Sequence, residues 1–357
     1  MSYAGDSLIG KLYAGSNPVL RLYSGDTISW QPTSADGTMW IEEFTGAGGV
    51  GNTVSGLPWR PGILMTTDNT GPTSGRMWAT ETTNKYDDMW SWSSTTPVTG
   101  FGELTADGWT GSSTYWTTSG VDYQVFHWPA GSGGVINNDG TIASEVYNSP
   151  ISGTACGRYY GNGLGSATVG HGMGAQPCLL LIWGDCQDIR NGRIWAPTFG
   201  THPLGTWSEN GGETGDNGIV TANTTTFELD GILATNELGS AMDWVAFTDT
   251  PGKIASGSVN GDNVSTVTVT GLGFEPRLMI LLGRDGGVTD ARGQYAFTYR
   301  DGQTAPYFAN YRTLNSGYST PNPQPVSTDV QFLADGFSIE PGFRGNNGTA
   351  ATWIAFA

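Results

Sequence analysis

One short pattern occurs three times in this chain of 357 residues: a glycine-rich turn, a proline and then a short apolar run. Residues 271–276 read Gly-Leu-Gly-Phe-Glu-Pro, and an almost wholly apolar run follows directly. The pattern recurs at Pro177 and at Pro61, so the three prolines are 116 and then 99 residues apart. A short apolar run bounded by turn residues predicts a buried β-strand. The chain therefore contains three equivalent predicted strand entries.

Two further landmarks follow each predicted strand in the same order. An Asp-Gly step occurs at residues 107–108, 230–231 and 335–336, and an apolar closing strand occurs at 122–126, 243–247 and 352–356. Asp-Gly between apolar flanks predicts a hairpin with those two residues at the centre of its turn. The period exceeds that of solenoid repeats, so we expect three copies of one domain, each with its own core.

The composition indicates which kind of domain is repeated. Short apolar runs alternate with segments rich in Gly, Thr, Ser and Asn, and the chain carries 14 Trp, 14 Tyr and 13 Phe. The first property is typical of all-β proteins and the second of packed cores. We predict an all-β chain: three tandem antiparallel β-sandwich domains preceded by a short N-terminal β docking segment. The predicted limits are 1–35 for that segment and 36–134, 135–250 and 251–357 for the domains.

Charge and segment patterns argue against several partners. The formal net charge is −17, which disfavours nucleic acid and anionic membranes because both require basic patches. No apolar run is long enough to insert into a membrane, and residues 1–6 lack the pattern of a signal peptide. We expect Cys178 in the core, and a Cys178–Cys186 disulfide stays an open alternative. We expect no cofactor.

The N-terminal segment contains its own duplication. Leu12 and Tyr13 begin a Leu-Tyr-x-Gly motif that returns at Leu22 and Tyr23, and Trp30 follows. Alternation and turn residues predict two or three short strands. Because about 30 residues cannot bury a core alone, this segment must pack on the chain's own domains or on a partner.

This duplicated motif resembles segments of bacteriophage minor tail and tail-fibre proteins, notably those of actinobacterial phages. The repeated domain is also similar to β-sandwich modules of phage structural proteins. The resemblance implies a non-enzymatic virion protein that is made in the bacterial host cytoplasm and binds other virion proteins. We also expect this protein to form a homo-oligomer. It implies docking through Leu12, Tyr13, Leu22, Tyr23 and Trp30.

Catalytic and metal sites are not predicted. The three histidines lack zinc spacing, and His171 is expected to be a turn residue with satisfied hydrogen bonds. Carboxylates at 87–88 and at 185 and 188 leave glycan cleavage open as the least favoured alternative. Loops 137–140 and 260–263 are interpreted as Asx turns rather than Ca²⁺ sites, because they lack regular ligand spacing.

Aromatic residues give two hypotheses for recognition. Eight tryptophans lie in the first domain, where they fill a core or an interface or else form a sugar-stacking platform. We favour the core or interface, and assign host or partner contacts to aromatic residues in loops of the other domains. These candidate recognition residues are Trp207, Tyr307, Phe308, Tyr311 and Tyr318. A host surface glycan is one candidate ligand, which gives a carbohydrate-binding adhesin as the alternative function.

Overall fold

The computed structural model describes most of the repeated part of the chain. The described residues are 13–14, 17–18, 22–24, 27–30, 39–45, 52–68, 77–81, 90–91, 102–111, 119, 122–131, 133–184, 193–197, 218–230, 235–262, 264–283, 294–298, 307–311, 324–325, 330–341 and 350–357. They form eight antiparallel sheets, and the fold is all-β with sandwich-like domains, as predicted.

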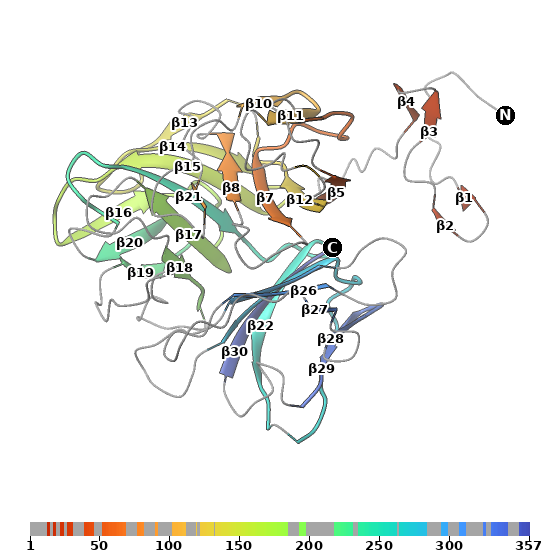
Figure 1. Ribbon diagram of the computed structural model, residues 1–357. Helices are drawn as coiled ribbons and strands as arrows, with labels where there is room; N and C mark the ends of the chain where they lie inside the picture. The colour runs from red at the N-terminus through yellow and green to blue at the C-terminus, as the bar shows by residue number, and fades with distance from the viewer. Residues whose placement is uncertain are drawn as a thin grey trace.

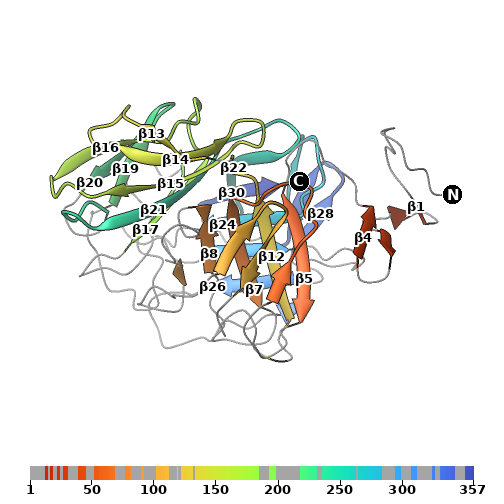
Figure 2. The same cartoon turned by 90° about the horizontal axis from the view of Figure 1, so that it is seen from above.

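The N-terminal segment forms two small hairpins. β1 (Tyr13–Ala14) pairs with β2 (Asn17–Pro18), and β3 (Leu22–Ser24) pairs with β4 (Thr27–Trp30). Each is a two-stranded sheet that takes no strand from the rest of the described chain. In Figures 1 and 2 the hairpins lie beside the larger sheets and apart from them.

The first repeat, called unit 1 here, consists of two facing sheets. A large sheet has the order β5-β12-β7-β8-β9, and a small sheet has the order β10-β11-β6. Its strands are β5 (Trp40–Thr45), β6 (Asn52–Val54), β7 (Ile63–Asp68), β8 (Met77–Thr80), β9 (Trp90–Ser91), β10 (Gly102–Thr105), β11 (Gly108–Gly111) and β12 (Asp122–Trp128).

Unit 2 has the same plan with two additional strands at one edge. The large sheet has the order β13-β14-β15-β21-β17-β18 and the small sheet β16-β20-β19. Its strands are β13 (Val135–Asn137), β14 (Ser144–Ser149), β15 (Thr154–Tyr160), β16 (Ser166–Gly170), β17 (Leu179–Gly184), β18 (Arg193–Trp195), β19 (Gly218–Ala222), β20 (Thr226–Asp230) and β21 (Ala241–Phe247).

Unit 3 repeats the plan again. Its large sheet is β22-β30-β24-β25-β26-β27 and its small sheet is β23-β29-β28. The strands are β22 (Ile254–Asn260), β23 (Val267–Thr270), β24 (Leu278–Gly283), β25 (Gln294–Thr298), β26 (Tyr307–Tyr311), β27 (Gln324–Pro325), β28 (Val330–Leu333), β29 (Gly336–Ile339) and β30 (Ala350–Phe356).

The predicted strand entries are equivalent in the structure. Pro61, Pro177 and Pro276 each stand two residues before the central strand of a large sheet, namely β7, β17 and β24. In each unit the residue between the proline and the strand donates its backbone N–H to the last residue of the closing strand, at 2.7–2.9 Å. The threefold repeat is therefore confirmed at the level of backbone pairing. The exact limits of the domains stay a prediction.

Each unit buries its own core between its two sheets, and the repeats show why certain residues are paired. In unit 2 the ring of Trp244 covers Gly157 on the neighbouring strand, where a Cβ would lie 2.6 Å from a ring carbon. In unit 3 Trp353 covers Gly257 in the same way. Unit 1 has Val125 at the equivalent position, and the facing residue is Glu42 instead of glycine. A bulky ring on one strand thus requires a missing side chain on the next.

The three units also share a fourth core, which was not expected. On each large sheet, the face that points away from the small sheet contributes to one cluster. This cluster contains Ile63, Leu179 and Leu278 from equivalent positions. At its centre Trp128, Phe247 and Phe356, the last residues of the closing strands, form a ring triangle with centroids 5.1–5.3 Å apart. Figures 1 and 2 show the three large sheets gathered around a common centre. The expectation that each copy owns a core is therefore incomplete, because the copies are also joined in a pseudo-threefold body.

The prediction that Asp-Gly forms the centre of the hairpin turn is wrong. The turn of the β28–β29 hairpin is formed by Ala334 and Asp335, and Gly336 is the first residue of β29. Gly336 is needed because a Cβ there would overlap the carbonyl oxygen of Val269 on β23. In unit 2, Asp230 ends β20, and the equivalent turn lies at residues 223–225. Gly336 is thus required for close packing against β23, whereas the sequence pattern had indicated a role in the turn.

Candidate functional site

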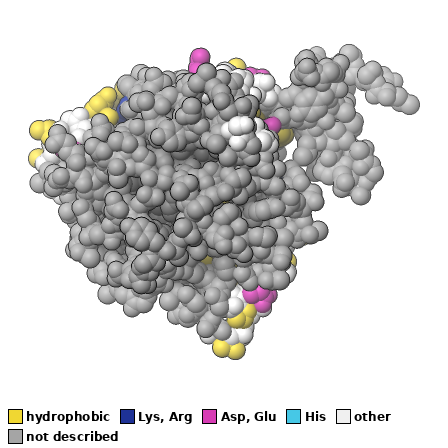
Figure 3. Space-filling model, viewed as in Figure 1, with side chains coloured by type: hydrophobic (Ala, Val, Ile, Leu, Met, Phe, Trp, Pro, Cys, Tyr) yellow, Lys and Arg dark blue, Asp and Glu magenta, His cyan; other side chains and the backbone are white. Residues whose placement is uncertain are grey.

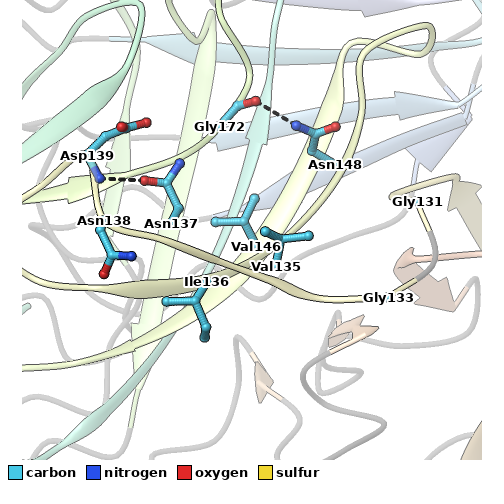
Figure 4. A pocket seen from close by; sticks show the side chains of 10 residues that line it. All are labelled: Gly131, Gly133, Val135, Ile136, Asn137, Asn138, Asp139, Val146, Asn148 and Gly172. Atoms are coloured by element: carbon cyan, nitrogen blue, oxygen red, sulfur yellow. Dashed lines mark hydrogen bonds between the residues drawn. The ribbon is translucent and has the colours of Figure 1, made fainter.

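The clearest concavity in the described residues lies at one open edge of unit 2. It has a volume of about 680 Å³ and lies between the extra strands β13 and β14 and the loop after β16 (Figure 4). A volume of this size fits the usual range for small-molecule sites. Its lining residues are Gly131, Gly133, Val135, Ile136, Asn137, Asn138, Asp139, Val146, Asn148 and Gly172. We call this concavity the edge pocket.

The chain between units 1 and 2 forms one wall of the edge pocket. Ala130 is fully buried in the shared core, and Gly131 has a φ of +70°. A Cβ at Gly131 would collide with the backbone oxygen of Asn148. This end of the glycine-rich stretch is thus fitted closely against β14.

Hydrogen bonds hold the opposite wall in place. The amide Oδ1 of Asn137 accepts the backbone N–H of Asp139 at 2.8 Å, which forms an Asx turn. Thr141 and Thr168 exchange two hydrogen bonds of 3.0 and 2.9 Å between side-chain oxygens and backbone N–H groups. The Oγ of Ser144, which is buried, donates to the carbonyl of Gly170 at 2.6 Å. The inserted segment is therefore attached to the small sheet at several points.

Several polar atoms of the edge pocket are left available. The Nδ2 of Asn148 donates to the carbonyl of Gly172 at 2.6 Å, which leaves its Oδ1 open (Figure 4). The Nδ2 of Asn137 and the side chains of Asn138 and Asp139 have no hydrogen-bond partner within the described residues. Among the described lining residues there is no cationic side chain, and Asp139 is the one carboxylate. Donors and acceptors therefore lie together without a positive charge.

Apolar side chains complete the edge pocket. Figure 4 shows Val135 beside Val146, with Asn137 and Asp139 further along the same side of the chain. Val146 is buried, whereas Val135 and Ile136 are 67% and 60% exposed. Exposed aliphatic side chains beside polar groups are typical of a surface that contacts a partner or ligand.

Unit 2 carries most of the exposed large apolar side chains. Within the described ranges these are Val135, Ile136, Ile151, Tyr160, Leu164 and Leu238 in unit 2, and Val264 in unit 3. Figure 3 shows hydrophobic side chains at the left edge, over unit 2, and at the lower tip, over unit 3. Among the described residues, the exposed large apolar side chains are therefore concentrated in unit 2.

His171, next to the edge pocket, has the role that the sequence predicted. Its ring is fully buried, its Nε2–H donates to the carbonyl of Asn223 at 3.0 Å, and its Nδ1 accepts the N–H of Met173 at 3.2 Å. Both nitrogens are thus satisfied in the neutral form. Burial lowers the pKa of His171 below its ordinary value.

This geometry predicts a pH-dependent stability. Because the folded state holds His171 neutral, acid favours the unfolded state, which takes up a proton near the ordinary pKa of about 6.5. The stabilisation is present above that pH and should be lost as pH falls from about 6.5 toward the lowered pKa. Urea unfolding at pH 7 and pH 5 should show a smaller loss in His171→Gln than in the wild type. Parallel losses in the two proteins would contradict this assignment.

Arg158 and Asp243 form a buried ion pair with a structural role. The guanidinium of Arg158 on β15 donates to both carboxylate oxygens of Asp243 on β21, at 2.7 and 2.6 Å. The two residues face one another in the strand register, and both are nearly fully buried. A bidentate pair of this kind fixes the alignment of neighbouring strands.

Metal-binding clusters and catalytic carboxylates are the remaining candidates for a site. In the described ranges, no three His, Cys, Asp or Glu residues are grouped so that they could hold a metal ion. Asp262 accepts the N–H groups of Val264 and Ser265 at 2.8 Å, so this loop and the 137–140 loop form Asx turns, as interpreted from the sequence. Cys178 is buried and carries a free thiol, so it is not in a disulfide. The carboxylates at 87–88, 185 and 188 lie outside the described residues.

The predicted site residues are not brought together. Tyr13, Leu22, Tyr23 and Trp30 lie in the N-terminal hairpins, whereas Leu12, Trp207 and Tyr318 lie outside the described residues. The prediction that Tyr307, Phe308 and Tyr311 are loop residues is wrong, because they belong to β26, which pairs with β25 in the large sheet of unit 3. β26 is short and its flanking segments are polar, so its sequence pattern resembled that of a loop with aromatic residues.

The edge pocket was missed, although the sequence contained a signal for it. Pro61 and Pro177 are 116 residues apart and Pro177 and Pro276 are 99 apart, and most of this difference is the extra segment that includes β13 and β14. An insertion in one copy of a repeat is a common position for a binding loop. Among the first-domain tryptophans, Trp109 and Trp128 are core residues, whereas Trp40 and Trp59 are only partly buried.

The chain belongs to the family described as "Domain of unknown function (DUF7483)", whose model matches residues 43–357. The match runs through all three units and begins after the N-terminal hairpins. No curated protein matches the chain. Within the described part of the chain, no helix has the length and apolar character needed to cross a bilayer.

Proposed function

We propose that this member of the DUF7483 family is a non-enzymatic virion structural protein, a tail or fibre component that docks by its N-terminus and presents the three-unit body. The observation that supports it best is the separation of the two parts. Units 1–3 share a core, whereas β1–β2 and β3–β4 are two-stranded sheets that pair with nothing else in the described chain. An isolated two-stranded hairpin is marginally stable, so such hairpins gain stability when a partner surface covers them.

The division of the chain supports the same proposal. The family match excludes the first 42 residues, so the N-terminal segment is separable from the body by sequence as well as by strand pairing. The duplicated Leu-Tyr-x-Gly motif resembles segments of phage tail and fibre proteins, and this resemblance implies a docking role for Tyr13, Tyr23 and Trp30. Other virion proteins, or further copies of this chain, would be the partners.

Deletion of residues 1–35 tests the docking role. The truncated chain should keep its melting temperature, because β1–β4 pair with no strand of units 1–3 in the described chain. Its content in purified particles should fall at least about tenfold, since the hairpins supply the anchor area. The measurement is quantitative mass spectrometry of particles from a strain that expresses only the truncated chain. Normal incorporation of a folded truncated chain would show that docking occurs elsewhere.

A carbohydrate-binding adhesin is the second candidate, and the edge pocket favours it. This role is compatible with the first, since a fibre component can also contact the host envelope. The edge pocket lies on unit 2, the unit with the most exposed apolar side chains in the described structure. Turnover of a glycan is the third and least favoured function.

A further inference from the structure

We infer that the edge pocket of unit 2 binds a neutral saccharide of one or two rings. The inference deepens the adhesin alternative of the proposed function and rests on it. Its first basis is shape: a concavity of about 680 Å³ holds a ligand of this size. The pocket is formed by β13, β14 and the segment before them, additions that units 1 and 3 do not share in their described strands.

The hydrogen-bonding groups match hydroxyl groups. A hydroxyl both donates and accepts, so a saccharide needs donors and acceptors side by side. The pocket offers the Nδ2 of Asn137, the Oδ1 of Asn148, the amide of Asn138 and the carboxylate of Asp139, none of which is used within the described structure. Amide and carboxylate groups are suited to adjacent hydroxyls because each carries two polar atoms.

The apolar lining matches the remainder of a sugar ring. Val135 and Val146 lie beside one another in Figure 4, next to Asn137 on the same strand. Aliphatic side chains can cover the C–H groups of a pyranose while the polar groups bind its hydroxyls. The pocket thus has the mixed character that a saccharide requires.

Charge selects against acidic ligands. The described lining residues include one carboxylate and no cationic side chain, and the whole chain carries a net charge of −17. A phosphate, a sialic acid or another anionic ligand would lack the Arg or Lys partners that such groups need. A neutral ligand avoids this cost.

The pocket is also preorganised. The Asx turn at Asn137, the Thr141–Thr168 pair and the Ser144–Gly170 hydrogen bond hold its outer wall without a ligand. Little of the binding free energy is therefore needed to order these walls.

The test uses the full chain and saturation-transfer NMR with a panel of neutral sugars: maltose, cellobiose, galactobiose, mannobiose and arabinobiose. Sialyllactose serves as the anionic probe, chitobiosamine as the cationic probe and an uncharged Ser-Thr-Val peptide as the peptide probe. We expect at least one neutral disaccharide to bind with a Kd of about 1 mM or below. The double variant Asn138→Ala/Asp139→Ala should weaken it at least about tenfold.

Matched controls separate a ligand effect from misfolding. Both replaced residues are exposed, so the variant should keep its melting temperature. Glu275→Ala, an exposed carboxylate in unit 3, should leave binding unchanged. The inference is overturned if no neutral sugar binds at about 10 mM, if the double variant binds as well as the wild type, or if only a charged or peptide probe binds.

This result is independent of particle assembly. Sugar binding by a chain that is absent from purified particles would overturn the virion role and keep the edge pocket. Incorporation into particles without any sugar binding would do the reverse.

Discussion

Phe247→Ala is expected to lower the free energy of unfolding of the whole chain by about 3–5 kcal/mol. Phe247 is fully buried in the shared core and contacts the rings of Trp128 and Phe356, which belong to the other two units. Removing its ring leaves a cavity that three packed sheets cannot close by a local shift, so the loss should lie in the upper part of the range for core truncations.

The same experiment distinguishes a shared core from three independent ones. Calorimetry should show that Phe247→Ala lowers the unfolding temperature of all three units, because Phe247 belongs to unit 2 and its ring partners to units 1 and 3. Leu238→Ala, also in unit 2 but 76% exposed, should change the free energy of unfolding by less than about 0.5 kcal/mol. A loss confined to one of several separate transitions would contradict the shared core.

Asp243→Asn should destabilise the chain by about 3–5 kcal/mol. The variant removes the charge that faces the buried guanidinium of Arg158, and both side chains are at most 4% exposed. Removing one partner of a buried ion pair costs far more than the net stabilisation of the pair. Chemical denaturation of wild type and variant at pH 7 measures the difference.

A double replacement provides the control for this prediction. Arg158→Met with Asp243→Leu removes both charges and should regain most of the lost stability, because an apolar pair fills the same space. The assignment fails if the double replacement is no more stable than Asp243→Asn.

Much of the fold could be predicted because strands and their entries restrict which residues can occur at nearby positions in the sequence. A proline cannot donate to a sheet and a strand needs apolar faces, so Pro61, Pro177 and Pro276 mark three strand entries in the sequence and in the structure. The closing strands were also predicted, since a run such as residues 353–356 is apolar on both faces.

The shared core could not be predicted from the same residues. In β17, Leu179 and Leu181 belong to the shared core, whereas Leu180 and Ile182 belong to the core of unit 2. A strand that is apolar on both faces predicts burial on both sides, but it does not specify which element covers each side. A small sheet covers one face and two other units cover the second, an arrangement that depends on contacts distant in sequence.

The edge pocket was hidden for a different reason. Its polar residues occur in an Asn-Asn-Asp-Gly turn, and such a turn has the same sequence whether or not it borders a concavity. Its remaining wall comes from Asn148 and Gly172, which the fold brings to the turn through the pairing of β14 and the loop after β16. Convergence of this kind is a property of the tertiary structure.

The location of the protein in the particle is the most direct test of its proposed role. Particles made by the genome that encodes this chain can be purified on a density gradient, digested and searched by mass spectrometry, with gold-labelled antibody against unit 3 in parallel. We expect peptides from all three units in the particle and label on its tail or fibres. A chain that is abundant in infected cells but absent from purified particles would contradict the proposed function.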